Sequence, residues 1–201
     1  IVYRPAVLLL DEPLSNLDAR LRLEMRSEIR RICREAGLTA LYVTHDQQEA
    51  LSMADGVVVL RDGRVEQHGT PQALYQRPCN RFVAEFMGET NFIDGTVVTA
   101  DDHGCQVRTS AGMLPSATGG LAAGARVTLS VRPESLRLVP GDGLLQGRCS
   151  GSVYLGGQAQ HHVDTAAGRI KVCETDPRTT TREGQSLHMH ADRDAIVALA
   201  C

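Results

Sequence analysis

The segment VLLLDEPLSNLD, residues 7–18, contains the pattern that decides the fold of the first part of the chain. Four apolar residues run directly into two adjacent acids, Asp11 and Glu12, and a proline follows them. An uninterrupted apolar run is typical of a strand covered on both faces, so this strand is predicted to be buried. Removing a carboxylate from water is costly unless a metal, a proton or a partner compensates its charge. The two acids therefore indicate either a ligand site or, more simply, a cap on the next helix.

Strand and helix patterns alternate around this segment. Apolar residues recur at helical spacing from residue 17 to residue 36, with Asp18 near the N-cap position and Gly37 beyond the last turn. The arginine-rich opposite face of this helix is predicted to be solvated, with glutamate partners. TALYVTH predicts a second buried strand, and VVVLRDGRVEQHG predicts a hairpin. Short helices are predicted for three segments: DQQEALSMA, the residues that follow Pro71, and NRFVAEFMG. The alternation predicts an α/β layered domain.

The pattern changes at GETNF, residues 88–92. Beyond this segment the sequence has no long helical periodicity, and short β-like runs are separated by Gly, Pro, Asp and Ser clusters. Regular short strands with frequent turn signals predict a small all-β barrel or sandwich. A domain boundary is therefore predicted near residue 89, which divides the chain into residues 1–88 and 89–201.

Composition excludes several classes of protein. The 201 residues are 42% hydrophobic and 22% charged, with a net charge of −3 and no block of like charges, so no nucleic acid partner is indicated. No apolar run approaches the length needed to span a bilayer. The six cysteines are scattered without a CxxC pair, which favours reduced thiols over a disulfide framework or a zinc site. The paired histidines at 161–162 and 188/190 are interpreted as packed or solvated rather than metal-ligating.

The neighbours of Asp11 and Glu12 favour a ligand site over a helix cap. A strand that delivers two acids to its carboxyl end in an α/β sheet places them where such folds bind ligands. After one helix and one strand, His45 follows the second predicted strand, so it is expected in the same row. An acid in such a row can hold Mg²⁺ on nucleotide phosphates, and a second can orient or deprotonate an attacking water.

These residues resemble the ATP-binding subunits of ABC transporters. VLLLDEP resembles the Walker B strand of that family, SNLD (residues 15–18) its D-loop, and VTHD its switch region. The segments LSMADGVVVLRDGRVEQHGTPQALYQRP and FVAEFMGETNF resemble the end of the nucleotide-binding domain. SVRPESLRL, VYLG and RIKV are similar to the β-rich TOBE domain of bacterial importer ATPases. The resemblance covers nearly the whole chain.

The resemblance implies a role for each matching residue. Asp11 would hold Mg²⁺ through water, Glu12 would be the catalytic base, and His45 would contact the γ-phosphate of ATP. Ser15 and Asp18 would communicate with a second copy of the subunit. The partners implied are transmembrane permease subunits and, indirectly, a periplasmic or lipoprotein solute-binding protein, at the cytoplasmic face of the cell membrane. The transported solute would be of the polyamine, iron or phosphonate type.

The family's phosphate-binding string GxxxxGK[ST] does not occur in the 201 residues, and Lys171 is the only lysine. The chain is thus expected to correspond to the C-terminal part of a longer subunit, and to be inactive by itself. YLGGQ, residues 154–158, resembles the family's LSGGQ signature, but its position far downstream predicts a hairpin turn instead. The main alternative is a non-catalytic regulatory module that senses a ligand through the β domain. A DNA-repair or chromosome-structure ATPase is a weaker one, because that class lacks the TOBE-like extension.

Overall fold

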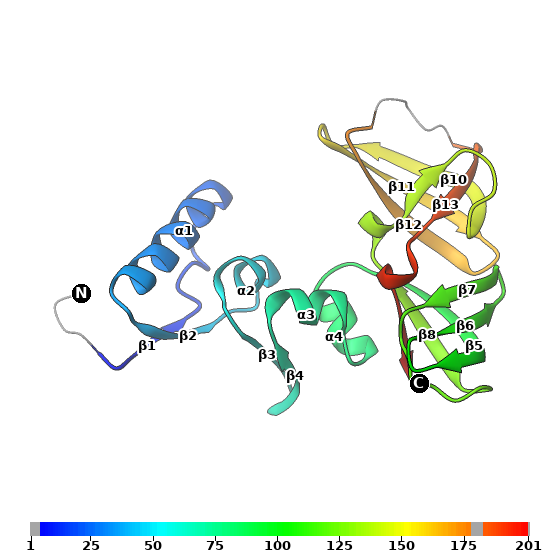
Figure 1. Cartoon of the computed structure of the whole chain (residues 1–201). Coiled ribbons are helices and arrows are strands. Elements are labelled where there is room, and N and C mark those ends of the chain that lie inside the picture. The colour runs from blue at the N-terminus through cyan, green and yellow to red at the C-terminus, as the bar shows by residue number, and fades with distance from the viewer. Residues whose placement is uncertain (1–4, 178–182, 201) are drawn as a thin grey trace. The chain divides into compact units, whose positions relative to one another are not determined.

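The computed structural model describes residues 5–177 and 183–200. It forms two compact units, one up to Tyr75 and the other from Gln76 onward (Figure 1). In the first unit, strand β1 (Val7–Asp11) pairs in parallel with β2 (Thr39–Val43), and helix α1 (Ala19–Glu35) connects them. Asp11 lies opposite Val43 in the register, so both strands end at the same edge of this sheet. The predicted strand–helix–strand order of this segment is therefore observed.

The ends of α1 follow from its sequence. Asp18 has an extended backbone, and its side chain accepts a hydrogen bond from the Leu21 amide at 2.9 Å. This is the N-cap arrangement predicted for Asp18. At the other end Ala36 is the C-cap, and Gly37 takes a φ of 61°, which glycine adopts without steric cost.

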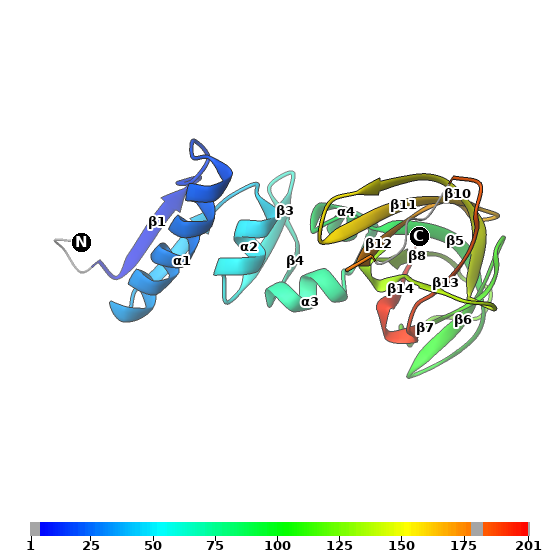
Figure 2. The ribbon, with the colours of Figure 1, turned by 90° about the horizontal axis from the view of Figure 1, so that it is seen from above.

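The prediction that β1 and β2 are buried on both faces is wrong for the described residues. In β1 alternate side chains are exposed, with 50% of the surface of Val7 and 70% of that of Leu9 accessible, and in β2 every residue except Tyr42 is exposed, with 59% for Leu41. Leu8 and Leu10 are half-buried. Helix α1 lies beside this two-stranded sheet in both views (Figures 1 and 2). Because successive side chains of a strand point to opposite faces, a single covering layer leaves every second side chain in water.

The rest of the first unit follows the predicted order. Helix α2 (Gln47–Met53) is followed by the hairpin of β3 (Val57–Arg61) and β4 (Arg64–Gly69), and then by α3 (Pro71–Gln76). Both turn residues of the hairpin have positive φ, 50° at Asp62 and 74° at Gly63. An Asp-Gly pair suits this turn because it tolerates the left-handed conformation at both positions.

The second unit begins with helix α4 (Arg81–Phe86) and continues as two five-stranded antiparallel sheets. The order of the first sheet is β14-β8-β5-β6-β7, and that of the second is β12-β11-β10-β13-β9. The strands of the first are β5 (Asn91–Asp101), β6 (Gly104–Thr109), β7 (Gly112–Ser116), β8 (Arg126–Val131) and β14 (Ile196–Ala200). Those of the second are β9 (Arg137–Val139), β10 (Leu145–Tyr154), β11 (Gln158–Thr165), β12 (Gly168–Thr175) and β13 (Ser186–His190).

Both sheets of the second unit share one hydrophobic core. Val97 and Leu129 enter it from the first sheet, and Val163 and Met189 enter it from the second. Each of these four side chains is at most 1% exposed. A single core under two sheets agrees with the all-β prediction for this part of the chain.

Arg132 fastens the start of this unit to its sheets. Arg132 is 7% exposed, and one nitrogen of its guanidinium donates to the carbonyl oxygens of Ala84, Gly88 and Glu89 at 2.9, 2.8 and 3.0 Å. A guanidinium can satisfy several orphan carbonyls at the end of a helix at once. The second compact unit therefore includes α4.

Asn91 joins the two sheets. Its side-chain amide donates to the carbonyl oxygens of Lys171 and Val131 at 2.8 and 3.2 Å and accepts from the Lys171 amide at 2.7 Å. Glu89 pairs with the Lys171 ammonium at 2.5 Å. The GETNF segment thus connects α4 to both sheets.

Among the residues that the structure describes, no helix is long and apolar enough to cross a membrane.

Candidate functional site

The two acids lie where β1 ends. Asp11 is the last residue of β1, and the Glu12 amide donates to the Val43 carbonyl oxygen at 2.9 Å, which extends the pairing to β2 by one residue. Glu12 has a φ of 44°, in the left-handed region. This conformation costs a residue with a Cβ about 1–2 kcal/mol. Such strain is concentrated at functional sites, where the surrounding structure maintains it.

Glu12 and His45 are in direct contact. The Nδ1 atom of His45 lies 2.8 Å from the Oε1 atom of Glu12, and both side chains are open to solvent. The hydrogen bond and the charge of Glu12 raise the pKa of the His45 imidazole above its ordinary value. The structure thus brings together a carboxylate and an imidazole at the carboxyl edge of two parallel strands, next to the exposed Asp11.

Ser15 and Asp18 lie on the loop between β1 and α1. The Ser15 hydroxyl and amide both donate to the Glu12 carbonyl oxygen, at 3.0 and 3.2 Å, which closes a tight turn. Leu14 is 2% exposed and anchors the loop, whereas Ser15 and Asp18 are exposed. Asp18 caps α1, as described above. All five predicted site residues therefore lie on two adjacent segments.

Sequence reasoning missed a buried polar cluster directly behind His45. Arg26 of α1 and Glu49 of α2 are 7% and 3% exposed, although a solvated arginine-rich face was expected for α1. The exposed Arg20–Glu24 and Arg31–Glu28 pairs agree with that expectation, but Arg26 reaches Asp46 at 2.9 Å. The feature of the sequence that could have indicated this cluster is the pair of acids Asp46 and Glu49 after His45, because a buried acid requires a cationic partner.

The YLGGQ segment and His161 both lie in the β-rich part of the chain. The YLGGQ residues join β10 to β11, with Tyr154 opposite Ala159, so the hairpin prediction is confirmed. His161 is 1% exposed, and its ring nitrogens contact Ser152 Oγ at 2.9 Å and Glu174 Oε2 at 3.1 Å. Within the described ranges, no group of three or more His, Cys, Asp or Glu residues could hold a metal ion.

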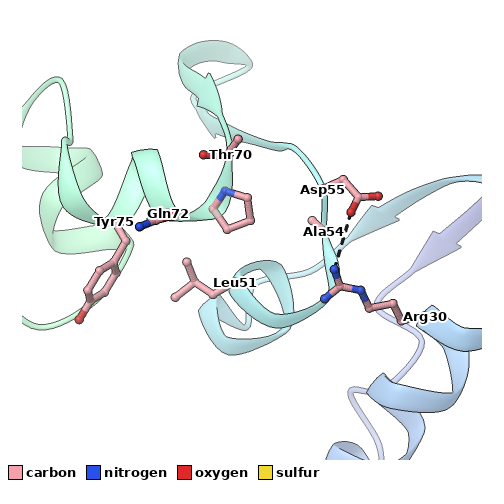
Figure 3. Close-up of a pocket in the computed structure, with 8 residues that line it drawn as sticks. Arg30, Leu51, Ala54, Asp55, Thr70, Gln72 and Tyr75 are labelled. Atoms are coloured by element: carbon pink, nitrogen blue, oxygen red, sulfur yellow. Dashed lines mark ion pairs between the residues drawn. The ribbon is translucent and has the colours of Figure 1, made fainter.

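An open cavity of about 580 Å³ lies elsewhere in the first unit (Figure 3). Arg30 and Asp55 form an ion pair on its wall, with a nitrogen–oxygen distance of 3.7 Å, and Leu51 and Tyr75 also line it. Neither Glu12 nor His45 lines it. The carboxylate–imidazole edge, and not this cavity, is the candidate site.

Comparison with known proteins agrees with the motifs. Residues 129–199 match the family model of the TOBE domain. The chain is 43% identical over 182 residues to the spermidine/putrescine import ATP-binding protein PotA of Ruegeria pomeroyi, covering 89% of this chain and 50% of that protein. It is 42% identical over 175 residues to the Fe(3+) ions import ATP-binding protein FbpC 1 of Rhizobium meliloti, covering 87% of this chain and 49% of that protein. The chain therefore spans about half the length of the curated relatives it matches.

A solved structure supports the β architecture. The crystal structure of the cytoplasmic molybdate-binding protein ModG with molybdate bound matches with a TM-score of 0.50 and 16% identity, covering 55% of this chain and 96% of that protein. This likeness shows the fold alone.

The relatives and the family model confirm the resemblance identified in the motifs. Over most of its length the chain is similar to the ATP-binding subunits of bacterial ABC importers, and it carries a match to the TOBE domain.

Proposed function

We propose that this chain forms part of the ATPase subunit of a bacterial ABC importer, which couples ATP hydrolysis to the uptake of a small solute. The observation that carries the proposal is the 2.8 Å contact between Glu12 and His45 at a strand edge, in a chain similar to import ATP-binding proteins. Residues 1–88 would be the C-terminal part of the nucleotide-binding domain, and residues 89–201 a TOBE-type domain. A module without catalysis is not favoured, because the relatives are named as ATP-binding import proteins.

Asp11, Glu12 and His45 would each have a different role in ATP hydrolysis. Glu12 would hold the attacking water and accept its proton, as a positioned carboxylate does in general base catalysis. His45 would donate a hydrogen bond to the terminal phosphate, where charge changes during transfer. The contact between His45 and Glu12 would keep the two side chains in a fixed position relative to each other. This role for His45 agrees with the raised pKa, which favours the donor form of the ring.

The residues present fit a Mg²⁺ ion bound together with ATP. Mg²⁺ usually keeps several waters and is held by one or two carboxylates plus phosphate oxygens, so it does not require a dense protein cage. The exposed Asp11 carboxylate at the end of β1 is a donor of this kind. When bound, the ion would neutralise charge on the phosphates, and Asp11 would hold it through water.

The remaining proposals concern partners and substrate. Ser15 and Asp18, exposed on the loop before α1, would contact a second copy of the subunit across a shared nucleotide. The subunit would bind permease subunits at the cytoplasmic face of the membrane, with a solute-binding protein acting on the other side. We propose a polyamine or ferric iron as the solute class, following the names of the relatives.

The test uses the longest reading frame that contains these 201 residues. A GxxxxGK[ST] string and an LSGGQ-like signature ahead of residue 1, with a permease gene adjacent, would support the proposal. The encoded protein, purified with that permease, is expected to hydrolyse ATP only when Mg²⁺ is present. Asp11→Asn should lower turnover at limiting Mg²⁺, whereas Asp55→Asn, a change in the open cavity, should not. Absence of ATP turnover, with binding of a small solute by the β-rich part, would instead support the regulatory alternative.

A further inference from the structure

Arg26 binds the segment that carries His45. It projects from α1, is 7% exposed, and its Nη2 atom lies 2.9 Å from Asp46 Oδ2 and 3.9 Å from Glu49 Oε1. Arg22, one turn earlier on the same helix, approaches Asp46 at 3.5 Å. Asp46 directly follows His45 and also caps α2, since its side chain accepts from the Gln48 amide at 2.8 Å.

Glu49 ties the other neighbour of His45 into the same cluster. It is 3% exposed, and its Oε2 atom accepts from the Thr44 hydroxyl at 2.7 Å and from the Tyr42 hydroxyl at 3.0 Å. The Thr44 hydroxyl in turn accepts from the Asp46 amide at 2.9 Å. The residues on both sides of His45 are therefore fixed by hydrogen bonds to buried groups, while the imidazole itself is exposed.

A buried ion pair is a poor source of stability, because the cost of desolvating the charges offsets much of their attraction. Its better attested use is to fix one geometry. The cluster holds Thr44 and Asp46, the two residues that flank His45, whose imidazole contacts Glu12. This position indicates that the cluster sets the direction of the His45 ring.

We propose that Arg26, Glu49 and Thr44 are positioning residues that hold His45 against Glu12. The catalytic consequence rests on the proposed function, but the geometric claim does not. Asp18 is the N-cap of α1, so the helix that presents Arg26 follows directly on the Ser15–Asp18 loop.

The titration of His45 provides a readout that does not depend on ATP. Glu12 is the main group that raises its pKa, and Asp46 and Glu49 add to the effect through their charges. Arg22 and Arg26 of α1 are the cations that face the same segment. If the cluster loosens, the ring leaves Glu12 and its pKa falls toward the ordinary value of 6.5.

The first experiment compares Thr44→Val with Thr44→Ser in the 201-residue chain by NMR titration of the histidines. Valine removes the hydroxyl that joins Asp46 and Glu49, and serine keeps it. The His45 midpoint is expected to fall in the valine variant and to stay at the parent value in the serine variant. His68, outside the cluster, is the internal reference, and Arg30→Gln, a change further along α1, should leave the His45 midpoint unchanged.

Unfolding is recognised by loss of dispersion in the amide spectrum of the first unit. If Thr44→Val unfolds that unit, Tyr42→Phe replaces it, because it removes one hydrogen bond to Glu49 and keeps the ring. An unchanged His45 midpoint in a folded Thr44→Val or Tyr42→Phe variant would overturn the proposal.

The second experiment uses the ATP-hydrolysing subunit. Thr44→Val should lower kcat by about tenfold or more, with little change in KM for ATP, because a displaced His45 no longer donates to the phosphate on which charge changes during transfer. Thr44→Ser should restore kcat. A shifted His45 midpoint with unchanged kcat would overturn the positioning role in catalysis. If Glu12→Gln also left kcat unchanged, the proposed function itself would fail, and the titration would still decide the geometric claim.

Discussion

The imidazole of His45 and the carboxylate of Glu12 meet 33 positions apart in the sequence, with 2.8 Å between Nδ1 and Oε1. Two features of the first unit produce this contact. The parallel register sets Asp11 opposite Val43, so the residues that follow the two strands emerge side by side. The positive φ of Glu12 then turns the chain at the first residue beyond β1.

This contact predicts how the His45 region responds to pH. The folded-state pKa of His45 is raised above 6.5 by the Glu12 hydrogen bond. The contact therefore contributes its full stabilisation below the unfolded value near 6.5 and loses it as pH rises through the raised pKa. NMR titration should give a His45 midpoint above 6.5, and a lower one in Glu12→Gln. Identical midpoints in the two proteins would contradict a charged contact.

Arg132 should contribute strongly to the stability of the β-rich unit. Arg132→Met removes the donor to Ala84, Gly88 and Glu89 and leaves their carbonyl oxygens in a buried environment. We expect a loss of about 3 kcal/mol, seen as faster hydrogen exchange of the most protected β8 amides.

Arg137→Met is the matched control for that change. Arg137 forms an exposed pair with Asp192 at 2.7 Å, and such pairs contribute less than about 1 kcal/mol. Equal effects of the two substitutions on β8 exchange would show that Arg132 does not fasten α4 to the sheets.

Asn91 should be essential for the junction of the two sheets. Asn91→Ala removes its bonds to Lys171 and Val131 and should lower the free energy of unfolding by about 2 kcal/mol. Asn91→Asp should cost more at neutral pH, because it places a negative charge next to two carbonyl oxygens. The carboxylate is protonated in both states below about pH 4, so the two variants should converge there. A thermal melt at each pH measures this, and an aspartate variant as stable as the alanine one at pH 7 would contradict it.

Local sequence patterns predicted most helices, strands and turns, but they did not predict the contacts between residues far apart in the chain. The cap at Asp18, the Asp62-Gly63 turn and the short strands beyond residue 88 depend on neighbouring residues, so the sequence contains their full cause. Strand β7 contains Pro115, a residue type that argues against a central strand. The structure places β7 at the edge of its sheet, where proline is tolerated.

The burial of particular side chains was harder to predict. The exposed faces of β1 and β2 depend on what covers a strand, which its apolar run does not specify. Arg26 lies on a helix whose other arginines are mostly at the surface, and only the fold brings it to Asp46, 20 positions away. At the candidate site, the strand order led us to expect His45 in the same row as Asp11 and Glu12, but it indicated neither the direct contact with Glu12 nor the buried cluster of Arg26 and Glu49.

The most direct test of the account is the effect of Glu12→Gln on ATP turnover in the complete ATP-hydrolysing subunit. Glutamine keeps the shape of the side chain but cannot accept the proton of the attacking water. We expect kcat to fall by about 100-fold or more while the Kd for ATP stays close to the parent value. Glu24→Gln, on the exposed face of α1, should behave like the parent. Hydrolysis by Glu12→Gln at the parent rate would contradict the assignment of Glu12 as the base, and with it the reading of the β1–β2 edge as the catalytic site.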